Sequence, residues 1–504
     1  MAKNIRFSTG LNYSKIWAMN DSISNTAGVG TSDILETIAD YVARDSRLTP
    51  EAERTAALCV MDALACALGA LSDPPLLLGP LFDTAGRSDG LGARVLGTAL
   101  EANPAKAAFD TSMLIRWLDF SDTSVLGGHP SDNLGAILAA AEYRSVQLLR
   151  ASQPALTMGD AFRALRSAYE IQGCLASNRL DGPSVGLDHV IYVKLASAAV
   201  VAKLLGGDAQ TIRNALSNAV LDSQSLNAYR HVPNAGTRKG WAGADAASRG
   251  VTLAAMALRG EMGYPDPLRA PVWGFEAVHL GGRALQLGRT PGDYFLERVI
   301  FKLVPCQRNG STAVEAAIQL HEWFRAHGFE AERIEIFTQD EAMRRIVKSG
   351  PLPNVAARDH CLQYMVAVAL LTGKLTAASY SDAMAADPRI DALRARMTVT
   401  ESPEYTGAHH DPDVHSCANA IRITARDGAV SELVEVAFPV GDPVRRDEAA
   451  GLLHAKFRDL AGHCWDADRQ DAVIQLFGDT AALCAMTVPD FMDCVTDKPV
   501  PRAR

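Results

Sequence analysis

The chain has 504 residues, of which 48% are hydrophobic and 21% charged, and its formal net charge at pH 7 is −9. This composition is typical of a globular protein with two or three domains. The sequence contains no run rich in Lys and Arg, which argues against nucleic acid as a partner. It contains no run of about 18 apolar residues, which argues against a membrane span.

The nine cysteines are widely spaced, and no two of them form a C-x-x-C pair. This spacing excludes zinc ribbons, thioredoxin-type motifs and the common iron–sulfur motifs. An odd number of thiols in a long chain favours an intracellular protein. Residues 1–31 lack the apolar core of a signal peptide. We expect them to form a flexible leader of a cytoplasmic protein, with a mitochondrial presequence as the open alternative.

Residues 32–275 are predicted to form a large all-helical domain. Apolar residues recur at helical spacing from Asp33, and the pair Thr49-Pro50 is typical of a helix start. The Ala- and Leu-rich segment that follows is apolar nearly all round, which predicts a buried helix. Further Ala-rich helices are expected at 103–120, 133–150, 158–176, 193–206 and 208–224.

Residues 276–442 are predicted to form a smaller α+β domain. β-branched residues alternate with polar ones in 333–343 and 418–441, and Asp427-Gly428 separates two such runs, as in a hairpin. Residues 443–504 return to helical spacing and are expected to rejoin the helical domain. The predicted fold class is therefore mainly α, with a large all-helical domain and a smaller α+β lid domain.

The segment 116–133 gathers polar side chains at the end of an apolar helix and before a Pro. A helix end that delivers carboxylates and a histidine into a loop is a common form of acid/base site. The alternative is a capping network, in which Ser131 or Asp132 caps the next helix. The candidate site residues of this segment are Arg116, Asp119, Asp122, Thr123, His129 and Ser131.

Other blocks carry cations and histidines. Residues 186–194 place an Asp-His pair before a buried helix, and a capping Asp with a packed His is the alternative there. Residues 229–245 gather cations around a turn, which predicts a local site for carboxylates because Arg binds them bidentately; a solvated loop is the alternative. Residues 302–311, 358–364 and 409–412 add further polar groups. The candidates from all these blocks are His189, Arg230, His231, Arg238, Lys239, Lys302, Arg308, Arg358, His360 and Tyr364.

These blocks resemble, in the same order, those of the MmgE/PrpD family. The matching segments are RWLDFSDT with GHPSDNLGAIL, YEIQGCLA, GLDHVIYVKLAS, YRHVPNAGTRKGWAGADAASRG, GEMGYPDPLRAPVWGF, RDHCLQYMVAVALL and HHDP. The resemblance implies a helical domain with a smaller α+β lid, a homodimer, small polycarboxylate substrates and no metal, iron–sulfur cluster or other cofactor. The family's active-site positions fall on Asp119, Thr123, His129, Lys239 and Tyr364, and a branch motif falls on His189.

The activity that the resemblance implies is the removal of water from 2-methylcitrate. Two features depart from the family: Asn309 stands where a His is usual, and the loop before GHPSDN is shorter. A shorter loop leaves room for a larger substituent, so a longer 2-alkylcitrate is a second candidate substrate. Decarboxylation of a cis-aconitate, epimerisation of a polycarboxylate and a non-catalytic role remain the alternatives.

Dehydration of a 2-alkylcitrate requires positive charge in the site. Removing a proton next to a carboxylate adds negative charge to a group that is already anionic, so cations must lie there in a site that excludes water. We expect Lys239, with Arg230 or Arg238, to supply this charge.

Proton transfer requires a base and an acid within reach of the substrate. We expect Asp119 and His129 to share this work, with His189 or Tyr364 as the second donor. A histidine serves either role near neutral pH, so the sequence leaves the assignment of acid and base open.

Overall fold

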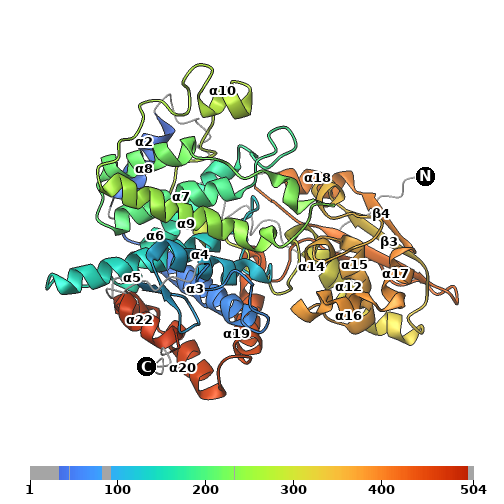
Figure 1. The fold of residues 1–504 in the computed structure, drawn as a ribbon. Helices are drawn as coiled ribbons and strands as arrows, with labels where there is room; N and C mark the ends of the chain where they lie inside the picture. The colour runs from blue at the N-terminus through green and yellow to red at the C-terminus, as the bar shows by residue number, and fades with distance from the viewer. Residues whose placement is uncertain (1–32, 45, 82–91, 232, 412, 498–504) are drawn as a thin grey trace.

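Helices dominate the chain, and they are arranged in two parts that lie side by side (Figure 1). The structure is a computed structural model, and it describes residues 33–44, 46–81, 92–231, 233–411 and 413–497. The leader expected at residues 1–31 lies outside the described residues. Within the described part, no helix combines the length and the apolar character needed to cross a bilayer. The predicted mainly helical class is confirmed.

The helices of the larger part begin at side-chain caps that the sequence supplies. Thr49 Oγ1 accepts a hydrogen bond of 2.9 Å from Ala52 N, and Pro50 occupies the first position of α3. This confirms the predicted start of the helix. The helices before the lid are α2 (Ile34–Ala43), α3 (Pro50–Ala70), α4 (Pro104–Trp117), α5 (Leu134–Arg150), α6 (Met158–Ala176), α7 (Val190–Leu204), α8 (Ala209–Leu221), α9 (Arg238–Leu258), α10 (Phe275–Leu280) and α11 (Tyr294–Glu297).

Small residues bring α4, α7 and α9 into close contact at the centre of this part. A Cβ atom on Gly250 of α9 would lie 2.6 Å from Ser197 Cβ and 2.9 Å from Ala198 N, both on α7. α9 begins at Arg238, so the segment 238–245, which the sequence also allowed as a solvated loop, is the first turns of a central helix. A short strand pair, β1 (Ala93–Arg94) and β2 (Glu101–Ala102), packs against α4 and α5.

The lid is a mixed sheet with helices packed against it. Its strands are β3 (Ala331–Thr338), β4 (Met397–Glu401), β5 (Asn419–Ala425) and β6 (Val434–Val436), in the order β4-β3-β5-β6. β3 and β4 are parallel and the other pairs antiparallel, with Ile336 opposite Ile421. The hairpin predicted around Asp427-Gly428 is confirmed, because β5 pairs with β6 and Gly428 has φ +87°.

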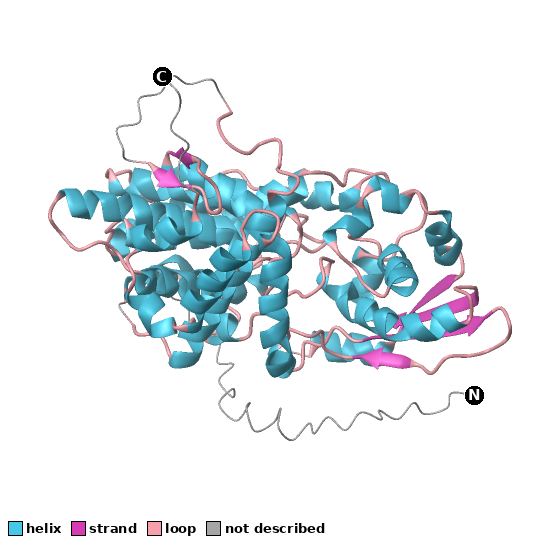
Figure 2. Ribbon diagram, turned by 90° about the horizontal axis from the view of Figure 1, so that it is seen from below, coloured by secondary structure: helices cyan, strands magenta, loops and turns pink. Residues whose placement is uncertain are grey.

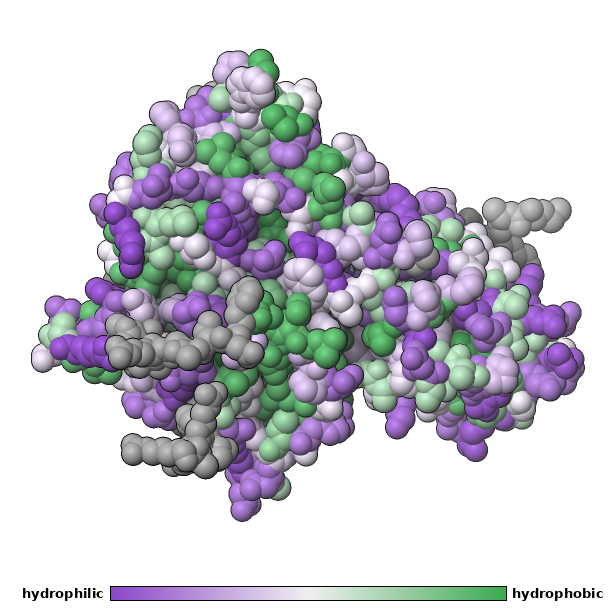
Figure 3. Space-filling view, in the orientation of Figure 1, coloured by the Kyte–Doolittle hydropathy of each residue, from purple (hydrophilic) through white to green (hydrophobic). Residues whose placement is uncertain are grey.

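The lid helices pack on one another and on the strands through apolar side chains. They are α12 (Ser311–Ala326), α13 (Asp340–Arg345), α14 (Val355–Arg358), α15 (Leu362–Thr372), α16 (Asp382–Ala385), α17 (Pro388–Arg394) and α18 (Pro403–His410). Figure 2 shows the four strands together toward the outer side of the lid. The space-filling view shows an indentation where the two parts meet (Figure 3).

The chain returns to the larger part after the lid. The returning helices are α19 (Arg446–Ala461), α20 (Ala467–Gly478), α21 (Thr480–Ala485) and α22 (Val488–Val495). The core of the larger part contains residues from 34–301 and again from 453–495, whereas the core of the lid contains residues from 306–436. The two connections between the parts lie side by side: Phe301 N donates to Gly441 O (3.1 Å), and Arg446 Nη2 donates to Val299 O (2.7 Å).

The substitution Gly250→Ala tests the close packing of α7 and α9. The added methyl group would meet backbone and Cβ atoms that cannot rotate away, and overpacking of this kind costs about 1–3 kcal/mol. We expect a lower thermal unfolding midpoint, measured by circular dichroism. Gly451→Ala in the exposed face of α19 is the matched control, because a Cβ atom there has no neighbour within 4 Å. It is expected to be neutral or stabilising, and equal destabilisation by both variants would contradict the packing argument.

Candidate active site

A cavity of about 1860 Å³ lies between the larger part and the lid. Its wall on the larger part includes Arg116, Asp119, Thr123, His129, His189, Arg230 and Lys302, and its wall on the lid includes Arg308, Asn309, Arg345, His360, His409 and His415. Polar groups from both parts therefore face one cavity.

The carboxylate of Asp119 lies at the inner end of the cavity and is 2% exposed. The residue follows the end of α4 with φ +49°, a left-handed conformation that is uncommon outside glycine. Its Oδ1 lies 2.7 Å from Arg116 Nη1 and 2.6 Å from Lys302 Nζ, and its Oδ2 lies 2.9 Å from Lys239 Nζ. Burial opposes ionisation, but these three cations together hold the pKa of Asp119 well below its usual range.

Lys239 joins Asp119 to the lid. Its ammonium also donates to Asp359 Oδ2, and Asp359 Oδ1 lies 2.7 Å from His360 Nδ1. Burial and Lys239 lower the pKa of His360 to about 4 against the opposing charge of Asp359. Oxygens of the two aspartates and a ring nitrogen of His360 lie within 4.8 Å of one another and could offer ligands to a cation. The ammonium of Lys239 already supplies positive charge between these carboxylates.

An unprotonated ring nitrogen of His129 lies next to the carboxylate of Asp119. Its Nδ1 lies 2.8 Å from the backbone oxygen of Asp122, and a carbonyl only accepts, so Nδ1 carries the proton. Nε2 therefore bears a lone pair, and it lies 3.5 Å from Asp119 Oδ1. Burial, Arg116 and Lys302 lower the pKa of His129 well below its usual value of 6.5. The ring is neutral at physiological pH and is placed as a base.

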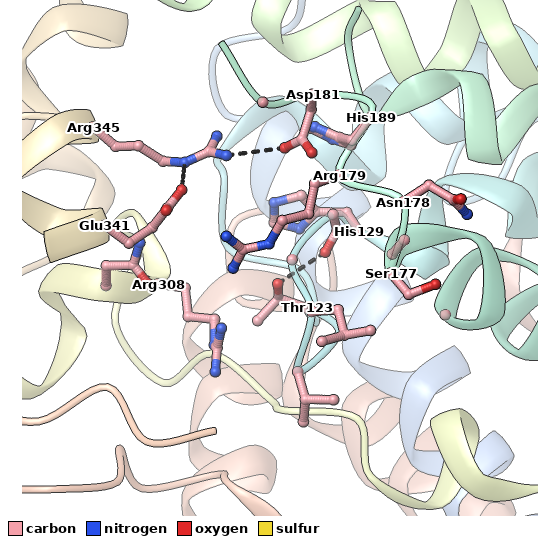
Figure 4. Close-up of a pocket in the computed structure, with 18 of the residues that line it drawn as sticks. Thr123, His129, Ser177, Asn178, Arg179, Asp181, His189, Arg308, Glu341 and Arg345 are labelled. Carbon is pink, nitrogen blue, oxygen red and sulfur yellow. Dashed lines mark hydrogen bonds and ion pairs between the residues drawn. The ribbon is translucent and has the colours of Figure 1, made fainter. Parts of the chain in front are cut away.

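The loop before His129 is closed by hydrogen bonds. Thr123 Oγ1 donates to Gly128 O at 2.8 Å (Figure 4). Thr123 and Ile300 also exchange backbone hydrogen bonds of 2.9 Å. These bonds fix the loop beside the segment that carries Lys302.

His189 lies next to His129, with 6.2 Å between the ring centroids. Its Nδ1 is 3.3 Å from Asp188 Oδ1, and its Nε2 is buried with no hydrogen-bond partner among the described residues. Burial and Arg230 lower the pKa of His189 to about 4. Arg230 is bound bidentately by Asp188, with Nε–Oδ2 at 2.6 Å and Nη2–Oδ1 at 3.1 Å, so this guanidinium is already paired with a carboxylate of the protein.

Two predicted site residues lie behind His129 rather than in the cavity wall. Asp122 accepts hydrogen bonds from Tyr169 Oη and from Ser131 N. Ser131 and Asp132 do not cap α5, because Asn133 precedes that helix and no side-chain cap bond forms. The capping alternative for this segment is therefore wrong, and the segment instead supports the ring of His129.

Three predicted residues lie at the edge of the cavity or away from it. His231 is exposed at the edge. Arg238 stacks on the ring of Trp241, 4.3 Å from its centroid, and donates to Ser225 Oγ. Tyr364 is buried in the core of the lid, where its hydroxyl donates to Ser379 O (2.8 Å). Neither Arg238 nor Tyr364 lines the cavity.

An ion pair and a hydrogen bond cross the outer part of the cavity. Arg345 of the lid reaches Asp181 of the larger part, with 3.0 Å between Nη2 and Oδ2 (Figure 4). Arg179 lies 3.3 Å from His410 Nδ1 across the same opening. Arg308 is held by its Nη2 bond to His415 O (3.1 Å), while its buried Nε has no partner among the described residues.

The sequence did not single out Asp359, which balances the charge of Lys239. The signal was present in the run Arg358-Asp359-His360, where three polar residues precede an apolar helix. His409 and His410 of the HHDP block also line the cavity, as does His415 shortly after it.

Comparisons with known proteins agree with this architecture. Residues 36–288 match the MmgE/PrpD N-terminal domain, and residues 304–479 match the MmgE/PrpD C-terminal domain. A 2-methylcitrate dehydratase of Cupriavidus necator is 46% identical over 468 residues, which are 91% of this chain and 96% of the relative. That of Escherichia coli (strain K12) is 44% identical over 483 residues, 94% of this chain and 99% of the relative.

A fungal relative matches as well. The mitochondrial 2-methylcitrate dehydratase of Yarrowia lipolytica is 41% identical over 458 residues, which are 88% of this chain and 87% of the relative. Both domain matches and all three relatives together extend over most of the chain. The chain therefore belongs to the MmgE/PrpD family.

Proposed function

We propose that this chain is a hydro-lyase that removes water from 2-methylcitrate or a longer 2-alkylcitrate to give the corresponding cis-aconitate derivative. The observation that carries the proposal is the buried Asp119 carboxylate with three cations around it, beside the neutral Nε2 of His129. Relatives at 44% and 46% identity that are named 2-methylcitrate dehydratase support the same reaction.

The cavity offers cations to a substrate with three carboxylates. Arg116 and Lys302 lie at the inner end and Arg308 on the lid wall. The Nε atoms of Arg116 and Arg308 are buried and make no hydrogen bond within the described residues. A buried donor without a partner is costly, and a substrate carboxylate would satisfy both groups. We assign the substrate carboxylates to these three residues.

We assign the base to His129 and a positioning role to Asp119. A carboxylate whose pKa lies well below its usual range stays ionised, so Asp119 neither takes nor gives a proton readily. It holds Arg116, Lys239 and Lys302 in place instead. The Nε2 lone pair of His129 takes the proton next to the carboxylate, and the negative substrate raises the pKa of the ring toward neutrality.

Lys302 stabilises the negative charge that develops on the substrate when the proton next to its carboxylate is removed. Its Nζ donates two hydrogen bonds to Asp119, to O at 3.0 Å and to Oδ1 at 2.6 Å, so its third proton is left for the substrate. Burial lowers the pKa of Lys302, which favours proton donation to the departing hydroxyl. His189, whose ring centroid lies 6.2 Å from that of His129, is the alternative donor to the departing hydroxyl. Arg238 and Tyr364 have no role in this assignment because other groups of the protein already bind them.

The alkyl substituent is assigned to the apolar side of the cavity. Val125, Leu126 and Phe295 line it beside the charged end. The volume of about 1860 Å³ exceeds the roughly 300–1,000 Å³ of pockets that hold drug-sized ligands. Steric space therefore does not restrict the enzyme to a methyl group.

The oligomeric state of the protein and its cellular compartment remain predictions. We expect a homodimer in the cytoplasm, with a mitochondrial location as the alternative. The Yarrowia lipolytica relative carries "mitochondrial" in its name, which keeps that alternative open.

The proposed reaction is tested by following the ultraviolet absorbance of the new carbon–carbon double bond. Purified, chelator-treated protein is given citrate, 2-methylcitrate and a 2-alkylcitrate with a hexyl chain. We expect turnover of 2-methylcitrate or of the hexyl compound without added metal. Carbon dioxide release from cis-aconitate would indicate a decarboxylase, and racemisation of a polycarboxylate an epimerase. No turnover of the three citrates would refute the proposal.

His129→Asn tests the assignment of the base. General base catalysis contributes about 10²- to 10⁴-fold, so kcat should fall by that factor while the fold is kept. His321→Asn is the matched control, since His321 Nδ1 also binds a backbone oxygen, that of Leu370 at 2.9 Å, but lies outside the cavity wall. The control should keep its kcat, and an active His129→Asn variant would assign the base to another residue.

The pH dependence of kcat/KM reports the base in the free enzyme. Burial, Arg116 and Lys302 depress the pKa of His129, so the neutral and active form persists as the pH falls below 6.5. We expect kcat/KM to decline only well below that pH, and kcat to decline at a higher pH because bound substrate raises this pKa. A decline of kcat/KM near pH 7 would instead point to Asp132, whose pKa burial raises to about 7.

A further inference from the structure

We infer that Lys456, on the returning helix α19, is a positioning residue. It fixes the positions of Asp119 and Lys302 relative to each other through their backbones. This inference rests on the function proposed above, in which Asp119 and Lys302 act on the substrate. Lys456 does not line the cavity, so any effect on the reaction passes through these two residues.

All three protons of the Lys456 ammonium are used. Nζ donates to Asp62 Oδ1 at 2.6 Å, to Phe120 O at 2.7 Å and to Lys302 O at 2.9 Å. An ammonium group has three donors and no acceptor. The side chain is 4% exposed, and its Nζ also lies 3.9 Å from the centroid of the Phe120 ring.

Two of these three bonds are made to the segments that carry the site. Phe120 directly follows Asp119, whose backbone is in the left-handed region with φ +49°. Lys302 is the residue whose Nζ contacts Asp119 Oδ1 at 2.6 Å. A single ammonium thus ties the two backbones together next to their ion pair in the sequence. A displacement of either backbone would change the distance between the two charged groups.

The hydrogen bond to Asp62 explains why the charged ammonium of Lys456 is tolerated in a buried position. The Asp62 side chain, on α3, is 1% exposed and compensates the charge of Lys456. A buried ion pair contributes little net stability when apolar residues could fill the same space. The geometric constraint on two distant backbone segments is the contribution that an apolar side chain could not make.

The test compares Lys456→Met with the double variant Asp62→Asn/Lys456→Met. The single variant leaves Asp62 as an unpaired buried carboxylate and is expected to be less stable. The double variant removes both charges, so its thermal unfolding midpoint should return toward that of the wild type. Because a misplacement of about 1 Å costs up to about 10²-fold in rate, kcat should fall about 10- to 100-fold in both variants, with little change in KM.

Lys194→Met is the matched control. Lys194 on α7 is likewise buried and donates to one aspartate and to two backbone oxygens: Asp222 Oδ2 at 3.2 Å, Asp222 O at 3.3 Å and Ser223 O at 2.9 Å. It does not line the cavity. This variant should lose stability and keep its kcat.

Recovery of kcat together with stability in the double variant would overturn the inference, as would an equal loss of kcat in Lys194→Met. Crystal structures of the wild type and of the double variant give a readout that does not require activity. We expect the separation of Asp119 Oδ1 and Lys302 Nζ to increase from 2.6 Å, and an unchanged separation would also overturn the inference. A wild-type enzyme without turnover, combined with an increased separation, would refute the proposed reaction and leave the positioning role standing.

Discussion

The ionised carboxylate of Asp119 is the constraint on which the site depends. A carboxylate that is 2% exposed loses nearly all of its hydration, and only close cations compensate that loss. Arg116, Lys239 and Lys302 all lie within 3 Å of it. Moving these cations away from Asp119 would leave its buried charge without the compensation that replaces its hydration. The segments that carry these cations must therefore keep their positions relative to Asp119.

These cations come from three elements that are far apart in the sequence. Arg116 lies in the last turn of α4, Lys239 in the first turn of α9, and Lys302 in the connection that leads to the lid. The lid adds a second carboxylate to this cluster, because Asp359 shares the ammonium of Lys239. The site is thus a charge network that spans both domains, and its inner half is buried before any substrate enters.

Local patterns in the sequence were sufficient to predict most of the helices and strands. The cap at Thr49, the apolar character of α3 on all sides and the alternation that forms β3 depend on neighbouring residues, and the structure contains all three, with β3 ending at Thr338. The start of α9 at Arg238 was less clear because a Pro-Asn-Ala-Gly turn precedes it. Tyr364 falls in a family motif, yet its hydroxyl is bound by the lid itself. The pairing of Lys239 with Asp359 joins residues 120 positions apart, and no local pattern predicts such a contact.

The paired connections between the two parts have a mechanical consequence. Phe301 is hydrogen-bonded to Gly441 where the chain leaves and re-enters the larger part, so these connections form the natural hinge for the lid. Lys302 directly follows Phe301 and therefore lies almost on the axis of any such rotation. Rotation of the lid would leave the contact between Lys302 and Asp119 nearly unchanged, while His360 would move through a much larger arc. The contact between Asp119 and Lys302 thus belongs to the larger part and its connection, whereas His360 belongs to the lid.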